Sequence, residues 1–144
     1  MMRIEIVHQA SEELFDAFRR LVPQLTNNNP PPTREDLSAL VGSEATALLA
    51  AYADDESILG AASVTVYRVP TGVRAIIEDV IVDQSARGRG IGEALVRAAL
   101  EVARERGAAG VSLTSNPKRE AANKLYLKMG FKRRETNAYY FGFE

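Results

Sequence analysis

The chain has 144 residues, of which 46% are hydrophobic and 26% charged, and its formal net charge is −1. This length fits one domain, and a nearly neutral chain lacks the basic excess that would attract nucleic acid or an anionic membrane. The chain has no Cys and one His, so disulfides, thiolate metal sites and a Cys nucleophile are excluded, and no metal is expected.

The N-terminal third predicts one strand and two helices. Alternating polar and apolar residues over 3–8 predict a strand, and Ser11 precedes apolar residues at helical spacing. Residues 26–32, rich in Asn and Pro, predict a solvated connector, with the wall of an acceptor pocket as the alternative. A Thr-x-x-Asp sequence from Thr33 then predicts a short helix that ends near Gly42.

Three strands follow. Apolar and β-branched residues over 46–53, 58–69 and 73–83 are separated by short turn sequences, one of them Pro-Thr-Gly. Strands joined by such short turns are antiparallel neighbours. The middle of the chain is therefore predicted to be an antiparallel meander.

A glycine-rich segment, 84–92, joins the last of these strands to a helix predicted from Ile91 to Arg106. Glycines at positions 88, 90 and 92 let the backbone turn tightly and approach a ligand. A strand, a glycine turn and a helix N-terminus together favour phosphate binding. The glycines do not follow the dinucleotide-binding spacing, and no Lys-Ser/Thr pair completes a Walker A loop. The alternative is a turn that binds nothing.

The C-terminal part predicts a strand–helix–strand unit and one more helix. Gly107 closes the first helix and residues 110–115 form a strand, which runs parallel to the strand over 73–83. Asn116-Pro117 caps the next helix, which ends at Gly130, and residues 131–133 and 138–143 form the last strands. The predicted fold class is a single mixed α/β domain over 1–144, an antiparallel meander followed by a βαβ unit.

Two motifs carry a resemblance to a known family. The order Arg87-x-x-Gly90-x-Gly92 between a strand and a helix resembles the pyrophosphate loop of the GNAT acyl-CoA N-acetyltransferases. The second motif runs from Asn116 through Asn123 and Tyr126 to Gly130-Phe131, and is similar to the C-terminal motif of the same family. The resemblance spans nearly the whole chain and implies that the two parallel strands splay apart, with acyl-CoA between them.

The resemblance also implies which residues bind acetyl-CoA. The N–H near Val80 would hold the thioester carbonyl, usually at a bulge, and the N–H groups of Ile81 and Val82 would pair with the pantetheine arm like an added strand. The pyrophosphate would bind the loop and the start of its helix, and the C-terminal motif would complete the site. These further residues are Arg87, Gly88, Arg89, Gly90, Ile91, Gly92, Asn116, Asn123 and Tyr126.

Two adjacent acids are the candidates for the acceptor side. Glu78 and Asp79 interrupt the most apolar strand, and a carboxylate enclosed by apolar neighbours has a raised pKa that suits a general base. The alternative is an ion pair with Arg68 or Arg74. Adjacent strand residues face opposite ways, so only one acid would face the pocket, and a bulge would decide which. In the related enzymes such an acidic pair helps to bind the acceptor.

Tyr126 is the candidate general acid that protonates the leaving thiolate, with a packed core tyrosine as the alternative. The expected function is transfer of an acetyl group from acetyl-CoA to a primary amine of a small molecule by direct attack. Alternatives are a glucosamine-phosphate or protein N-terminal acetyltransferase and a non-catalytic acyl-CoA-binding module. No signal peptide or membrane span is predicted, which favours the cytoplasm, and the apolar C-terminal strand allows a homodimer.

Overall fold

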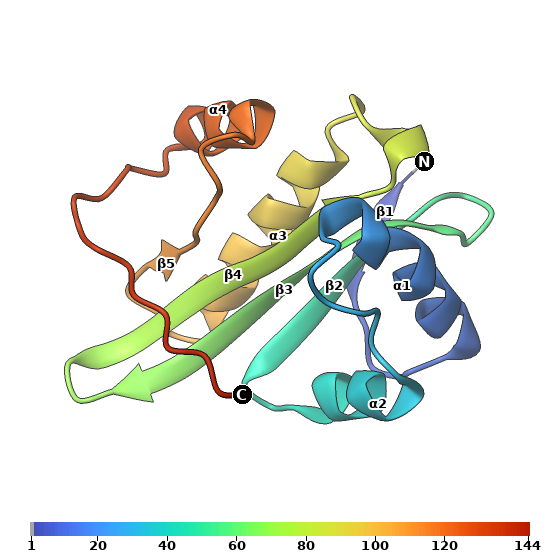
Figure 1. Ribbon diagram of the computed structural model, residues 1–144, viewed down its shortest axis with the longest axis horizontal. Coiled ribbons are helices and arrows are strands. Elements are labelled where there is room, and N and C mark those ends of the chain that lie inside the picture. The colour runs from blue at the N-terminus through green and yellow to red at the C-terminus, as the bar shows by residue number, and fades with distance from the viewer. Residues whose placement is uncertain (1) are drawn as a thin grey trace. The chain divides into compact units, whose positions relative to one another are not determined.

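The computed structural model describes residues 2–144 (Figure 1), and the chain divides into two compact units. The first unit ends at Leu113, and the second runs from Thr114 to Glu144. Each unit is described by itself below. The prediction of one domain over 1–144 stays a prediction.

The first unit is built on a sheet whose strands, in the part of the chain described, follow the order β1-β2-β3-β4-β5. Strands β1 to β4 are antiparallel neighbours, and β4 pairs with β5 in parallel. This arrangement confirms the antiparallel meander and the βαβ unit. The strands are β1 (Arg3–Ile6), β2 (Thr46–Tyr52), β3 (Ile58–Val69), β4 (Gly72–Val82) and β5 (Val111–Ser112).

Strand β5 is much shorter than the strand predicted over 110–115. It pairs with β4 only through Ala75↔Val111 and Ile76↔Ser112, and beyond Ile76 the β5 side of β4 forms no ladder. A strand continues only where its backbone pairs with a neighbour. β5 therefore ends at Ser112, where its pairing with β4 stops. A ladder this short is what the resemblance implies for two parallel strands that splay apart.

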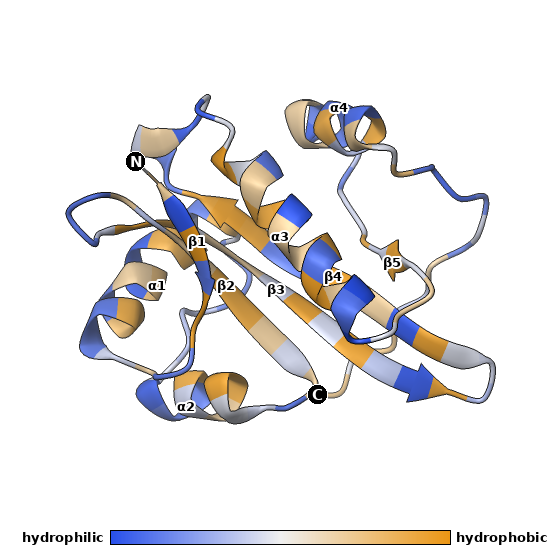
Figure 2. Cartoon of the chain, turned by 180° about the vertical axis from the view of Figure 1, so that it is seen from behind, coloured by the Kyte–Doolittle hydropathy of each residue, from blue (hydrophilic) through white to orange (hydrophobic). Residues whose placement is uncertain are grey.

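Helices cover both faces of this sheet. α1 (Glu12–Leu25) and α2 (Arg34–Gly42) lie on the face toward the viewer in Figure 1, and α3 (Ile91–Glu105) lies on the opposite face, seen in Figure 2. Buried side chains of α1 and α2 form one core cluster with the facing residues of the sheet. The cluster includes Leu14, Leu21 and Leu37 from the helices and Leu48, Ala61 and Ile81 from the sheet. The apolar stripes predicted for these helices therefore face the sheet.

The helix ends form as their sequences predict. Ser11 Oγ accepts a hydrogen bond from Leu14 N (3.2 Å), and Thr33 and Asp36 complete a reciprocal capping box at the start of α2. Gly107, with φ +88°, follows the last turn of α3. Among the described residues, no helix is long and apolar enough to span a bilayer.

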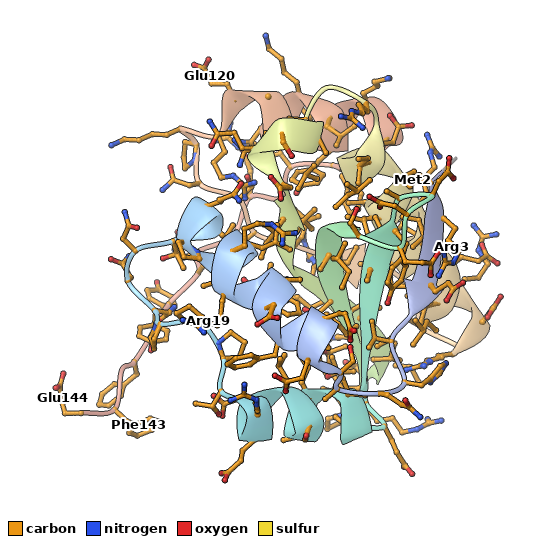
Figure 3. The ribbon with its side chains drawn as sticks, turned by 90° about the vertical axis from the view of Figure 1, so that its right-hand side faces the viewer. Met2, Arg3, Arg19, Glu120, Phe143 and Glu144 are labelled. Carbon is orange, nitrogen blue, oxygen red and sulfur yellow. The ribbon has the colours of Figure 1, made fainter. Side chains whose placement is uncertain are left out.

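The edge strand β1 is held by Arg3, labelled in Figure 3. Its guanidinium donates to both carboxylate oxygens of Glu56 (2.6 Å each) and lies 4.7 Å from the centre of the Tyr52 ring. Arg3 and Glu56 are exposed and Tyr52 is half-buried, so each contact contributes little to stability, but together they connect β1 to β2 and to the β2–β3 turn.

The second unit contains α4 (Glu120–Met129), which begins later than predicted. Asn116 does not cap it: its Oδ1 accepts from Lys118 N (2.9 Å), which makes a turn before the helix, and the N-cap residue is Arg119. Gly130 ends the helix with φ +104°, as predicted. The apolar spacing of α4 predicts an inward face of Ala121, Ala122, Leu125, Tyr126 and Met129. Of these residues, Tyr126 is buried and Ala121 is exposed.

The two last predicted strands do not form. Residues 131–144 lie outside helix and strand, and the side chains of Tyr139, Tyr140, Phe141 and Phe143 are exposed. An alternating apolar sequence becomes a strand only when a neighbouring backbone pairs with it, and the second unit offers no other strand. Figure 3 labels Phe143 and Glu144 at the end of this segment.

A close contact between β3 and β4 explains the glycine at position 60. A Cβ added to Gly60 would lie 2.5 Å from Ile81 O and 3.3 Å from Val82 Cα, both backbone atoms that cannot swing aside. Gly60 faces Val82 in the register, directly beside the end of β4. Only glycine lets the strands meet here without a shift.

We therefore expect Gly60→Ala to lower the free energy of unfolding by about 1–3 kcal/mol, the usual cost of overpacking. Urea denaturation measures this change. The matched control is Gly42→Ala at the end of α2, where an added Cβ meets no atom within 4 Å. That variant should be neutral or stabilised by up to about 1 kcal/mol, and an equal loss in both variants would contradict the close-contact explanation.

Candidate functional site

Strand β4 carries a β-bulge at Asp79 and Val80. The register passes from Ser63↔Glu78 to Ala61↔Ile81, so two residues of β4 face Ala62 alone. Asp79 has φ +52°, a left-handed conformation uncommon for a residue other than glycine. The bulge was an expectation of the family resemblance, and it lies where that resemblance implies a thioester contact.

The bulge also decides which acid faces which side. Ala61 packs in the cluster with α1 and α2, and Ser63, two residues on, shares its face. Glu78 pairs with Ser63 and so lies on the α1–α2 face, as Ile81 does beyond the bulge. The Ser63 hydroxyl donates to Glu78 O (3.0 Å) and holds this part of the bulge. The sequence analysis did not single out Ser63, because only the register brings it there.

Beyond the bulge, alternate N–H groups of β4 point to its open edge. Asp83 N donates to Leu59 O on β3 (2.7 Å), which makes Asp83–Leu59 and Ile81–Ala61 the hydrogen-bonded pairs. The backbone groups of Ile81 therefore point toward β3. This corrects the expectation that Ile81 offers an N–H to a ligand, because by alternation the N–H of Val82 is the one that points outward. The contact of the Val80 N–H with the thioester stays a prediction.

The loop after β4 presents a second set of free N–H groups. A 3-10 turn, η1 (Gln84–Ala86), leads into it, and Gly88 and Gly90 adopt φ +82° and +78°. Within residues 2–144, no protein group accepts from the N–H groups of the loop or the start of α3, which belong to Gly88, Arg89, Gly90, Ile91 and Gly92. A Cβ added at Gly88 or Gly90 would meet no atom within 4 Å, so the space above the loop is open.

Charge reinforces this arrangement. α3 begins at Ile91 and its macrodipole places positive charge at the loop. Arg87 and Arg89 are exposed there, and Arg87 Nε donates to Val82 O (3.2 Å), which holds its side chain beside the end of β4. Glu93, in the first turn, bonds Arg97 (2.8 Å) four residues on. The loop therefore suits an anionic ligand such as a pyrophosphate.

The two candidate acids are exposed, and neither is enclosed by the apolar residues that flank it in the strand. The described chain shows no ion pair between Glu78 or Asp79 and Arg68 or Arg74, and Arg74 bonds Thr71 Oγ1 instead (2.7 Å). The expectation of an apolar enclosure is therefore wrong, and so is the alternative of a structural ion pair. Both carboxylates are available to a cationic ligand.

The C-terminal motif forms two contacts within the second unit, one between Asn123 and Asn116 and one between Tyr126 and Phe131. Asn123 Nδ2 donates to Asn116 O (3.0 Å) and Arg119 O (2.9 Å), so its amide holds the turn before α4. The Tyr126 ring meets Phe131 edge to face with the ring centres 5.7 Å apart. Burial raises the pKa of Tyr126, with Arg119 opposing, so its hydroxyl keeps its proton at neutral pH. Contacts of these residues with acetyl-CoA stay predictions.

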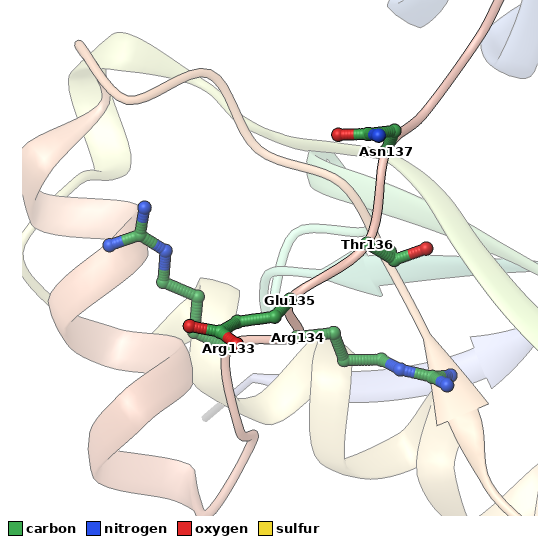
Figure 4. Close-up of a pocket in the computed structure, with 5 residues that line it drawn as sticks. All are labelled: Arg133, Arg134, Glu135, Thr136 and Asn137. Carbon is green, nitrogen blue, oxygen red and sulfur yellow. The ribbon is translucent and has the colours of Figure 1, made fainter.

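A surface hollow in the second unit does not add to the site. Figure 4 shows it beside five consecutive residues, 133–137, of the extended segment after α4. All five are exposed, so nothing encloses a ligand there. No group of three or more potential metal ligands occurs in the part of the chain that the structure describes.

Comparison with known proteins gives a consistent result. A model of the Acetyltransferase (GNAT) family matches residues 8–131. Glucosamine 6-phosphate N-acetyltransferase 1 of Oryza sativa subsp. japonica is 34% identical over 131 residues, which cover 83% of this chain and 77% of that protein. The family match includes the bulge, the loop and Tyr126.

Solved structures share the fold. A Trypanosoma brucei acetyltransferase is similar with a TM-score of 0.79 at 25% identity, over 98% of this chain and 99% of that chain. AAC(6')-Iy, solved in complex with the bisubstrate analogue CoA-S-monomethyl-acetylneamine, is similar with a TM-score of 0.80 at 20% identity, over 99% of this chain and 98% of that chain.

Proposed function

The chain belongs to the GNAT family of acyl-CoA-dependent N-acetyltransferases, and we propose that it moves an acetyl group from acetyl-CoA to a primary amine of a small molecule. The observation that carries this proposal is a set of backbone N–H groups that bond no protein acceptor, in two stretches. One lies at the open edge of β4 at Val82, and the other runs through the loop from Gly88 to Gly92 at the start of α3. Acetyl-CoA is long and anionic at one end, and these two stretches match both properties.

Each part of acetyl-CoA has a proposed partner. The N–H of Val80 stabilises the oxyanion that forms at the thioester carbonyl, and Val82 bonds the pantetheine arm. The pyrophosphate lies against the loop N–H groups, with Arg87 and Arg89 beside it. Asn116 and Asn123 are also proposed to bind acetyl-CoA, Asn123 through its amide oxygen, because both hydrogen bonds of its amide use Nδ2.

The amine attacks the thioester carbon directly. The N–C bond forms first and makes the carbonyl oxygen an oxyanion, and the C–S bond then breaks as the leaving thiolate takes a proton from Tyr126. The nitrogen gives up its remaining excess proton to solvent, and Tyr126 is reprotonated from solvent. The amine must first lose its own proton, to Glu78 or to a water that Glu78 orients. Glu78 is exposed on the α1–α2 face and forms no ion pair with Arg68 or Arg74, so its carboxylate can also bind a cationic acceptor. Glu78 and the adjacent Asp79 are therefore proposed to bind the substrate amine.

Within this class, an amino-sugar phosphate is the first acceptor to test. The observation that favours it is the 34% identity to a glucosamine 6-phosphate N-acetyltransferase over most of both chains. Turnover is measured with a thiol reagent, which detects only released CoA because the chain has no Cys. Glucosamine without phosphate is the matched acceptor. Equal rates with the phosphorylated and unphosphorylated acceptors would reject the phosphate preference. CoA binding without transfer to any amine or peptide N-terminus would indicate a non-catalytic acyl-CoA module.

Gly90→Val should abolish CoA binding, because the new side chain enters the open space over the loop. Calorimetry with CoA measures this. The control is Gly72→Val in the β3–β4 turn, where φ is also positive (+138°) and an added Cβ meets no atom. Gly72→Val strains the backbone in the same way as Gly90→Val, but at the opposite end of β4 from the loop. Its affinity for CoA should therefore stay at the wild-type value. Undiminished binding by the Gly90 variant would reject the loop as the pyrophosphate site.

Tyr126→Phe should lower kcat roughly 10²–10⁴-fold, the usual range for the loss of one acid–base group, and change CoA affinity little. Steady-state kinetics at saturating acetyl-CoA measure this. Tyr140→Phe is the control, because that ring is exposed in the same unit and should leave turnover unaffected. A change of only a few-fold in the Tyr126 variant would mean that the residue serves packing.

Glu78→Gln separates two roles of this carboxylate. If Glu78 is the base, kcat falls and the acidic limb of the pH–rate profile flattens. If it binds the acceptor, KM for the amine rises and the shape of the profile stays. Glu105→Gln is the control, because that carboxylate is exposed at the far end of α3 and has no proposed role in the site. A variant with neither change would show that Glu78 takes no part in the reaction.

A further inference from the structure

Helix α1 is bonded to the start of the acyl-CoA loop through Arg20. Its Nε donates to Asp83 Oδ2 (2.7 Å) and its second guanidinium nitrogen donates to Ile58 O (2.7 Å), so one side chain bridges the ends of β3 and β4. One turn further along α1, Gln24 Oε1 accepts from Gln84 N (2.8 Å). Two successive residues of the chain, 83 and 84, are thus held by one face of α1.

Asp83 connects Arg20 to the start of the loop through further hydrogen bonds. Its other oxygen, Oδ1, accepts from the N–H and the hydroxyl of Ser85 (3.1 Å each), and Asp83 O accepts from Ala86 N (2.8 Å), so Asp83 caps η1. The N–H of Ser85 and the guanidinium of Arg20 hold the pKa of Asp83 below its usual range, and the carboxylate is charged at neutral pH.

The rest of the loop has few restraints of its own. Ala86 and Ile91 are buried and fix its two ends, while the residues between them are exposed and include two glycines at positive φ. Within the loop itself, the guanidinium of Arg89 donates a hydrogen bond to Ser85 O (3.2 Å). The direction of the loop N–H groups therefore depends on how firmly the segment 83–86 is held.

We propose that Arg20 is a positioning residue for the acyl-CoA loop, acting through Asp83 and supported by Gln24. This inference rests on the proposed function for the role of the loop. A pre-ordered loop loses less conformational entropy when it binds the pyrophosphate, so the α1 contact strengthens cofactor binding without touching the cofactor. The chemical step uses other groups and is not affected.

The test compares Arg20→Met with the wild type. The expected result is a rise of about tenfold in Kd for CoA and in KM for acetyl-CoA, with kcat within twofold, in the range found for groups of one hydrogen-bond network. Arg20→Lys keeps the charge but lacks the planar guanidinium that bonds Asp83 Oδ2 and Ile58 O at once. Its Kd for CoA should therefore lie between those of the wild type and Arg20→Met. Arg20→Met combined with Asp83→Asn should cost less than the sum of the single changes, because both break one contact.

Arg19→Met is the matched control, because Arg19 is exposed on the same helix (Figure 3) and contacts Phe15 rather than the loop. Hydrogen exchange without ligand gives a second measurement: the Ala86 amide should exchange faster in Arg20→Met and not in Arg19→Met. Unchanged exchange and CoA affinity in Arg20→Met, or equal losses in both variants, would overturn the proposal. If the wild type bound no CoA, the proposed function would fail, while the Ala86 exchange would still decide whether Arg20 orders the loop.

Discussion

The separation of β4 from β5 is the constraint on which the site depends. A backbone polar group must find a partner, and a strand that loses its neighbour keeps a row of N–H and C=O groups for something else to bond. Within residues 2–144, β4 pairs on its second side with β5 at Ala75 and Ile76, and Ala109 N also donates to Val73 O (3.0 Å). The remaining length to Val82 is free on one side, and acyl-CoA is proposed to take the place of the missing strand.

The bulge lets the same strand serve the core and the site. Before it, Ala75 and Ile77 are buried on the α3 face, and beyond it Ile81 is buried in the cluster with α1 and α2. One extra residue reverses the alternation, so β4 contributes to both cores while two adjacent acids stay exposed between them. The left-handed conformation of Asp79 is the local cost, and Gly60 on β3 provides the room that the distorted strand needs.

The proposed cofactor side of the site consists mainly of backbone. The proposed donors are N–H groups of β4, of the glycine loop and of the first turn of α3, and their direction follows from register, φ angles and the contacts of α1 with Asp83 and Gln84. The proposed acceptor side has two exposed side chains, Glu78 and Asp79. Backbone donors tolerate substitution, whereas side chains would define the acceptor.

Local sequence determined the features whose partners lie a few residues away. The caps at Ser11 and Thr33, the glycine loop before α3 and the strand over 58–69 all follow from short-range patterns, which the structure confirms. The GNAT resemblance likewise rests on residues clustered in two short segments. The helix start expected at Asn116 failed, because that side chain bonds a turn instead.

Only the tertiary structure decided what depends on residues far apart in the chain. The face of Glu78 follows from the pairing with Ser63, the outward N–H of Val82 from the bond between Asp83 and Leu59, and the restraint on the loop from Arg20, 63 residues before Asp83. The short β5 and the unpaired segment after Gly130 have the same origin. A strand exists only where another backbone meets it, and no local pattern records which one does.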